Sequence, residues 1–155
     1  SVGSSVVDVD VCSSTGELAV LSYSILQTFS QDGRKTGEFE GRISKGWCVK
    51  FCGPQMAVSD FAENEIAFID RNSWQKVCSI ACASPQGLEV SHSEVIFSSY
   101  SQKKILCVDR TTGEIKWTME TGRRSDPSCL ALNGPEEILY TDYKKHCVKS
   151  IEPLM

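Results

Sequence analysis

A segment of about 40 residues recurs four times along this 155-residue chain. In each copy an apolar run closes with an aromatic residue, a short polar turn follows, and another apolar run comes next. The aromatic residues that close the four runs are Tyr23, Phe61, Tyr100 and Tyr143. A period near 40 with strand-like units is typical of β-propellers and other stacked repeats, so this spacing constrains the fold more than any other feature.

The third repeat indicates how many strands one unit contains. Residues 87–90 form a short inner strand, and residues 94–100 form a nearly continuous apolar run, as expected for a strand covered on both faces. Residues 105–109 form a third strand, and residues 114–119 alternate like an outer strand with one wet face. Gly113 supplies the positive φ of the hairpin turn between the last two strands. Four antiparallel strands in this length predict one propeller blade.

The predicted fold class is therefore all-β: a β-propeller of about four blades, each with four antiparallel strands, and almost no helix. The blades are expected at residues 6–41, 42–81, 82–122 and 123–155 of a single domain or segment. The last unit stops after its third strand, so we expect its blade to be incomplete. A part of a larger propeller, two chains completing one ring, and a closed four-blade ring all stay open. A β-sandwich explains many short strands but not the aromatic that recurs in register.

Composition excludes several classes of protein. With 41% hydrophobic residues, 23% charged residues and a formal net charge of −4, the chain suits a folded domain rather than a charged disordered tail. No apolar run reaches the roughly 18–20 residues that a membrane helix needs, so no membrane partner is expected. The first residues lack an initiator Met and a signal-peptide core, as in a mature piece or an excised segment.

The eight cysteines allow three interpretations. Most lie in apolar runs such as residues 47–52 and 105–108, which favours small buried hydrophobic residues. Disulfides in a secreted protein are the second interpretation. Zinc is the weakest, because the close pairs have C-x3-C spacing and neither histidine is near them. The first interpretation, with reduced thiols, favours a cytoplasmic location.

Aligned in this way, the units resemble NHL-type propeller blades. The family's opening is matched by residues 85–90, and its strand that ends in an aspartate beside an aromatic is matched by residues 58–61 and 140–143. Its following strand is matched by residues 66–70 and 105–109. The match is degenerate, and the first unit lacks the aspartate.

The resemblance implies a non-catalytic binding module. The best-known animal setting of such propellers is the C-terminus of tripartite-motif ubiquitin ligases, where they recognise RNA or protein. Two other propeller families match in one blade each. Residues 139–142 are similar to the YWTD blades of lipoprotein-receptor ectodomains, which would imply an extracellular receptor propeller that binds a protein ligand. Residues 109–117 are similar to a quinoprotein hairpin, although Trp117 is explained more simply as a packing residue against the neighbouring blade.

Function in propellers generally lies in the loops on one face. We call face one the side from which the loops between second and third strands and the blade-to-blade connections emerge, and face two the opposite side. Eight of the 16 basic residues are expected on face one, and we predict them as binding residues: Arg42, Lys45, Lys103, Lys104, Arg123, Arg124, Lys144 and Lys145. A basic face attracts phosphate or an acidic protein surface, and neighbouring aromatics can stack on RNA bases. A protein partner is the first expectation and RNA is the alternative.

No catalytic motif is present. The chain lacks a G-x-S-x-G elbow, a phosphate loop and a Rossmann fingerprint. Its two histidines, His92 and His146, are expected on opposite faces, and two are too few for the zinc lyases among NHL-like propellers. Cys147, which follows Lys145 and His146, is the only thiol in a setting that suggests reactivity. We therefore expect no enzyme activity, no metal and no cofactor.

Overall fold

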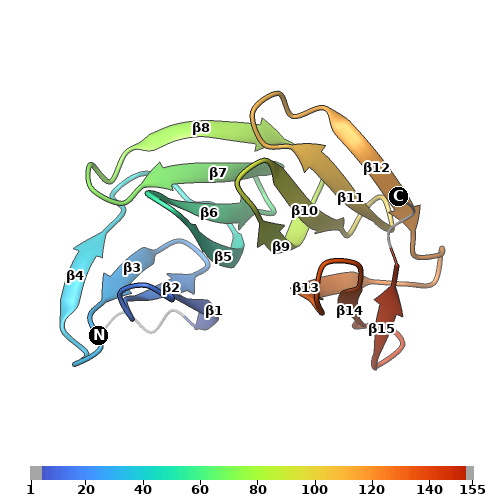
Figure 1. Ribbon diagram of the computed structural model, residues 1–155, viewed down its shortest axis with the longest axis horizontal. Helices are drawn as coiled ribbons and strands as arrows, with labels where there is room; N and C mark the ends of the chain where they lie inside the picture. Colours follow the sequence, from blue (N-terminus) through green and yellow to red (C-terminus); the bar gives the residue numbers. More distant parts are fainter. Residues whose placement is uncertain (1–4, 153–155) are drawn as a thin grey trace.

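The computed structural model describes residues 5–152, and these form fifteen strands in four antiparallel sheets without any helix. Each sheet is one blade, and consecutive strands pair from the centre outward (Figure 1). The strands of blades 1 and 2 are β1 (Val6–Val11), β2 (Leu18–Ser22), β3 (Leu26–Phe29), β4 (Lys35–Glu38), β5 (Gly46–Cys52), β6 (Gln55–Asp60), β7 (Glu65–Asp70) and β8 (Lys76–Ala81). Those of blades 3 and 4 are β9 (Pro85–Val90), β10 (Glu94–Ser99), β11 (Lys104–Asp109), β12 (Ile115–Glu120), β13 (Pro127–Leu132), β14 (Ile138–Asp142) and β15 (Cys147–Ile151).

The predicted all-β propeller with an incomplete last blade is confirmed. Blade 4 has three strands in the described part of the chain, and the other blades have four. Each sheet lies inside one of the four predicted ranges, and the end of the last range, residues 153–155, lies outside the described residues. The hairpin between β11 and β12 turns at Gly113, which adopts a φ of 74° as its sequence context predicts.

The hydrophobic core is divided into layers between neighbouring blades. Blades 1 and 2 bury a cluster that includes Leu21 and Met56, and blades 2 and 3 bury one around Phe68 and Phe97. Blades 3 and 4 share a smaller cluster, and Trp117 packs against it, as the sequence predicts. Apolar surface is therefore removed from water between sheets, and each blade depends on its neighbours for stability.

Hydrogen bonds from the second strand of one blade to the inner strand of the next reinforce these layers. The Ser59 hydroxyl in blade 2 donates to the Gln86 carbonyl in blade 3 at 2.7 Å. The Ser98 hydroxyl in blade 3 donates to the Ser128 carbonyl in blade 4 at 2.5 Å. The inner strands pack as the successive pairs β1–β5, β5–β9 and β9–β13, and within residues 5–152 no comparable packing joins β13 to β1.

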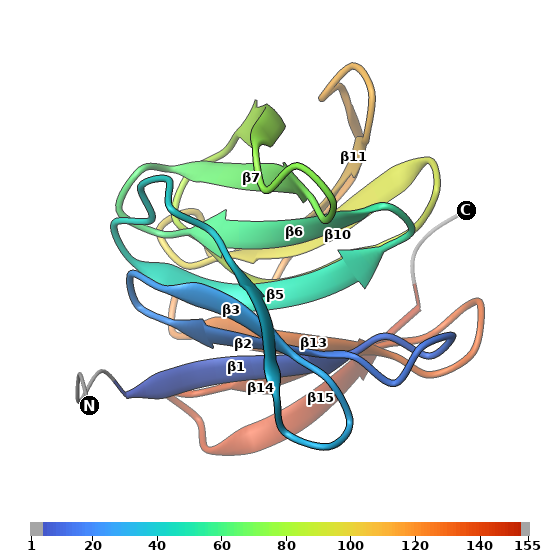
Figure 2. The same cartoon turned by 90° about the vertical axis from the view of Figure 1, so that its left-hand side faces the viewer.

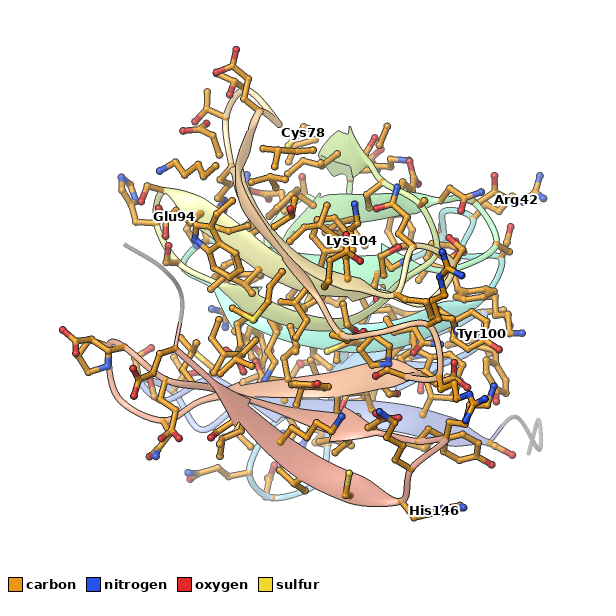
Figure 3. All side chains as sticks on the ribbon, turned by 90° about the vertical axis from the view of Figure 1, so that its right-hand side faces the viewer. Arg42, Cys78, Glu94, Tyr100, Lys104 and His146 are labelled. Carbon is orange, nitrogen blue, oxygen red and sulfur yellow. The ribbon has the colours of Figure 1, made fainter. Side chains whose placement is uncertain are left out.

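The strands run from side to side in Figure 2, so the loops emerge on two opposite faces. In Figure 3, Arg42, Tyr100 and His146 lie toward one side of the molecule and Glu94 toward the other. This separation agrees with the predicted division into face one and face two. In the described part of the chain no helix is long and apolar enough to cross a membrane.

The cysteines are all free thiols, but only half of them are buried. The buried ones are Cys12, Cys48, Cys52 and Cys107, whereas Cys78, Cys129 and Cys147 are exposed. The expectation that most cysteines are core residues is therefore too broad. Cys78 lies on the outer strand β8, and Cys129 and Cys147 lie in blade 4, so apolar flanking residues do not guarantee burial at the rim or at the end of the propeller.

A candidate binding pocket on face one

A buried carboxylate in blade 2 fixes the loops of face one. Asp60 ends β6, and its carboxylate accepts the backbone N–H groups of Ser44 at 2.7 Å and Lys45 at 2.9 Å. It also accepts the N–H groups of Ala62 and Glu63, both at 3.2 Å. One side chain thus joins the connection from blade 1 to the β6–β7 loop, which explains why an aspartate closes this strand.

Asp142 joins the corresponding two loops in blade 4. Its carboxylate accepts the Ser125 hydroxyl at 2.8 Å and the N–H groups of Asp126 at 3.0 Å and Lys145 at 3.3 Å. Burial by itself opposes ionisation, but these hydrogen bonds and the Lys149 ammonium outweigh it and lower the pKa of Asp142 to about 2. The carboxylate is therefore charged at neutral pH and holds the β14–β15 loop in place.

A cavity of about 540 Å³ opens between these loops. Four aromatic side chains contribute to its wall, and they come from blades 2, 3 and 4: Trp47, Phe61, Tyr100 and Tyr143. Lys45, Gln86 and Asp126 supply polar groups. A largely apolar hollow with a few convergent polar groups is the usual form of a binding pocket.

Three of the aromatic rings form a continuous run across blades 2 and 3. The ring centroids of Trp47 and Phe61 are 6.2 Å apart, and those of Phe61 and Tyr100 are 6.0 Å apart in an edge-to-face arrangement. The Lys45 ammonium lies 5.1 Å from the centre of the Phe61 ring, and the Lys103 ammonium lies 4.0 Å from that of Tyr100. Cation–π contacts at these distances hold the rings and the cations together.

Gln86 is the unusual polar group of the pocket. The residue is only 5% exposed, and its side-chain carbonyl Oε1 is buried without a hydrogen-bond partner among the described residues. An unpaired buried acceptor costs about 1–3 kcal/mol, so such groups are rare in folded proteins. The Oε1 atom thus has an unused capacity to accept a hydrogen bond from a ligand.

The predicted basic residues do not act as one uniform patch. Only Lys45 lines the pocket, and Lys103 lies beside it over Tyr100. Half of the eight have an acidic partner within 4 Å; the pairs are Arg42 with Glu63, Lys103 with Asp126, Lys104 with Glu120, and Lys145 with Asp142. Arg123, Arg124 and Lys144 are exposed and have no such partner in the described part of the chain.

Sequence reasoning missed Trp47, Gln86 and Asp126 as pocket residues. Trp47 and Gln86 stand near the start of β5 and β9, where the register with the next strand shifts, and a side chain at this position points toward the pocket. A large or polar residue at the second position of an inner strand could have predicted these two pocket residues from the sequence. Asp126 offered no such signal, because its place depends on the ion pair with Lys103 from another loop.

The histidines, cysteines and carboxylates that could serve catalysis or metal binding are not gathered in one place. His92 lies in the turn after β9 and His146 in the β14–β15 loop, so they are at opposite ends of the strands as predicted. Residues 5–152 contain no cluster of three or more groups that could hold a metal ion. Hydrogen bonds from Ser14 and Thr15 lower the pKa of the Cys12 thiol to about 6.

Comparison with known proteins supports the propeller fold but assigns no family. The chain matches no protein-family model and no curated protein. It is similar to the streptogramin B lyase structure, with 15% identity over 100% of this chain and 57% of that one, and a TM-score of 0.74. It is also similar to the computationally designed Ika4 protein (13% identity, 98% of this chain, 93% of that one, TM-score 0.74). The designed Ika8 protein matches at 12% identity over 96% of this chain and 46% of that one, with a TM-score of 0.72.

These identities are low, so the matches show the propeller fold alone. The chain spans about half the length of streptogramin B lyase and of the Ika8 chain, and nearly the whole length of Ika4.

Proposed function

We propose that this propeller is a non-catalytic binding module that recognises a peptide segment of a protein partner in the face-one pocket. The observation that carries the proposal is the buried, unpaired Oε1 atom of Gln86 within a wall of aromatic side chains. A peptide N–H that donates to this atom would remove the cost of the unpaired acceptor. Binding energy would then be concentrated at one polar anchor inside an apolar site.

The charges of the pocket favour a peptide over a polyanion. Lys45 and Asp126 both line it, so it offers one cation and one anion rather than a basic surface. Lys103 is already paired with Asp126. An apolar or aromatic side chain of the peptide would pack on Trp47 and Tyr100, and the two charged groups would orient its polar atoms.

The resemblance to NHL-type blades supplies the cellular setting of this proposal. In tripartite-motif proteins such propellers select the protein or RNA on which the ligase acts. We assign this chain the same kind of role, recognition of a protein substrate in the cytoplasm for a ubiquitin ligase. The free thiols support a reducing compartment over the extracellular receptor setting.

Selection from a random peptide library tests this function. Peptides selected on the native chain should bind Tyr100→Ala at least ten times more weakly, because the pocket loses an aromatic wall. Ile115→Ala is the matched control: Ile115 is 61% exposed on the outer strand β12, away from face one, and its loss should leave binding unchanged. Peptides that bind Tyr100→Ala as well as the native chain would contradict the proposal.

Single-stranded RNA is the second candidate, and one observation favours it. Tyr143 is 75% exposed beside Lys144, and Arg123 and Arg124 are exposed on the same face without acidic partners in the described chain. A labelled single-stranded RNA pool should bind weakly if the peptide proposal is correct. Tight binding that falls steeply with salt and is lost in the triple variant Arg123→Ala, Arg124→Ala, Lys144→Ala would assign the face to RNA instead.

A further inference from the structure

Each blade has two sides. Its leading side faces the next blade along the chain, and its trailing side faces the previous one. Three leading sides and three trailing sides are packed against each other in the core layers. The two that remain, the trailing side of blade 1 and the leading side of blade 4, are covered by no sheet within residues 5–152 and stand at the two ends of the arc (Figure 1).

The trailing side of blade 1 is mostly apolar, with Gln27 as a polar exception. Strand pairing places five apolar residues together on it: Val9, Val11, Leu18, Val20 and Phe29. In blade 2 the residues at the same register positions are Val49, Phe51, Met56, Val58 and Ile69, and they pack against blade 1.

The contrast in burial is clearest on the inner strands. Val9 is 49% exposed, although its equivalents Val49 and Leu88 are fully buried and Leu130 is 7% exposed. An apolar residue thus occupies this position in all four blades, but only in blade 1 does it lack a covering sheet. Apolar side chains held at core positions yet exposed to water indicate an interaction surface.

The leading side of blade 4 carries the polar half of the blade-to-blade contact. Ser59 and Ser98 each accept an N–H from their own inner strand and donate their hydroxyl to a carbonyl of the next blade. Thr141 stands at the same position in blade 4 and accepts the N–H of Cys129 at 2.9 Å. Its hydroxyl proton has no acceptor in the described part of the chain.

The surroundings of Thr141 fit a blade-to-blade contact as well. Strand pairing puts Ala131, Leu139 and Val148 on the same side as Thr141. Val148 is 65% exposed. These residues offer an apolar surface around one hydrogen-bond donor, as the leading sides of blades 2 and 3 do in their packed layers.

We propose that a second copy of this chain covers both end surfaces, head to tail. The leading side of blade 4 in each copy packs on the trailing side of blade 1 in the other, and the Thr141 hydroxyl donates to the carbonyl of Val7 in the second copy. Val7 is the bulged residue of β1, at the position that Gln86 and Ser128 hold in β9 and β13. Two identical junctions related by a two-fold axis then close one ring.

A second copy is the occupant because one chain carries both halves of the contact. The junction repeats the packing between blades 2 and 3 and between blades 3 and 4, in which Ser59 and Ser98 hold the position of Thr141. The chain also superposes on 46% of the longer Ika8 chain, so four sheets arranged like these form about half of a larger structure there. Peptide recognition in the pocket is not needed for this inference.

The mass of the 155-residue chain in solution, measured by light scattering or sedimentation, tests the proposal. The native chain should have twice the mass of one chain. Val9→Lys and Val148→Lys should each be folded monomers, because either substitution puts a charge into both junctions. Val77→Lys is the matched control: Val77 is 49% exposed, as Val9 is, but it lies on the outer strand β8, and this variant should stay dimeric.

Mixing the two monomeric variants adds a test of the head-to-tail arrangement. One junction in the mixture is unaltered, so Val9→Lys and Val148→Lys should form a one-to-one dimer together. Thr141→Val, which keeps the shape and removes the donor, should raise the dissociation constant of the dimer about ten-fold. A native chain that remains monomeric, or a Val9→Lys variant that remains dimeric, would overturn the proposal.

Discussion

Asp60 and Asp142 show how one side chain can organise a functional surface. Each closes the second strand of its blade and binds the blade-to-blade connection and the following loop at once. The aspartate of the repeat motif therefore builds face one rather than serving as a ligand-binding group. Gln86 has the opposite character, since its buried Oε1 atom has no hydrogen-bond partner among the described residues.

Replacing Gln86 should weaken peptide binding without lowering the stability of the fold. Gln86→Leu removes the unpaired acceptor, so the free energy of unfolding should stay the same or rise by about 1 kcal/mol, while selected peptides bind about ten times more weakly. Urea denaturation and a peptide titration measure the two effects. Gln55→Leu, at a partly exposed site on β6, is the control that should leave peptide affinity unchanged. A clear loss of stability in Gln86→Leu would show that the side chain is structural.

Asp142 should make stability depend on acid pH. Its folded-state pKa of about 2 lies below the usual 3.8, so the stabilisation is fully present above pH 4 and is lost as the pH falls toward 2. Asp142→Asn should lower the free energy of unfolding by about 2 kcal/mol at pH 7 and weaken its decline between pH 4 and 2. Urea denaturation at several pH values measures this, with Glu136→Gln, an exposed site, as control. Identical pH profiles for native chain and Asp142→Asn would refute it.

At Gly87 the inner strands of blades 3 and 4 approach each other closely enough for their backbones to touch. A Cβ atom built on Gly87 would lie 2.2 Å from the Ser128 carbonyl oxygen and 2.8 Å from the Leu130 nitrogen. Both atoms belong to the backbone of β13, so no side-chain rotation could relieve the clash. The glycine of the blade opening thus permits the close approach of β9 and β13.

Gly87→Ala should therefore push the inner strands of blades 3 and 4 apart and destabilise the fold. We expect a loss of about 3 kcal/mol or more in the free energy of unfolding, since the backbone of β13 must shift. Gly46→Ala is the matched control at the start of β5: its Cβ would lie 2.9 Å from a flexible Leu21 methyl group, so the cost should be about 1 kcal/mol. Urea denaturation compares the two variants, and an equal loss of stability would show that the β13 backbone does not restrict the residue at position 87.

The sequence predicts those features of the strands that depend on residues within a single repeat. The order of the strands, the hairpin at Gly113 and the packing of Trp117 follow from alternation and turn residues within a single repeat. The pairing of Lys103 with Asp126 did not follow, because it joins loops from different parts of the chain. Burial of Gln86 was also beyond sequence reasoning, since it depends on the neighbouring blade.

The pocket depends on how blades 2, 3 and 4 stack on one another. Its wall takes Trp47 and Phe61 from blade 2, Gln86 and Tyr100 from blade 3, and Tyr143 from blade 4. The buried layers between these blades set the distances across the pocket. Rigid display of loops by stacked sheets is thus the physical basis of the proposed recognition, and the arc's two ends remain available for a second copy.

The place where a selected peptide binds decides whether the face-one pocket is the recognition site. The measurement is a titration of isotope-labelled chain with a peptide selected on the native protein, followed by amide and indole NMR signals. The largest shifts are expected at the Trp47 indole N–H, the Gln86 side-chain amide and the Tyr100 backbone. The indole signals of Trp117 and of Trp74, which packs against the core layer of blades 1 and 2, should stay unchanged. Shifts confined to face two or to the outer strands, with the Trp47 and Gln86 signals unmoved, would contradict recognition in the face-one pocket.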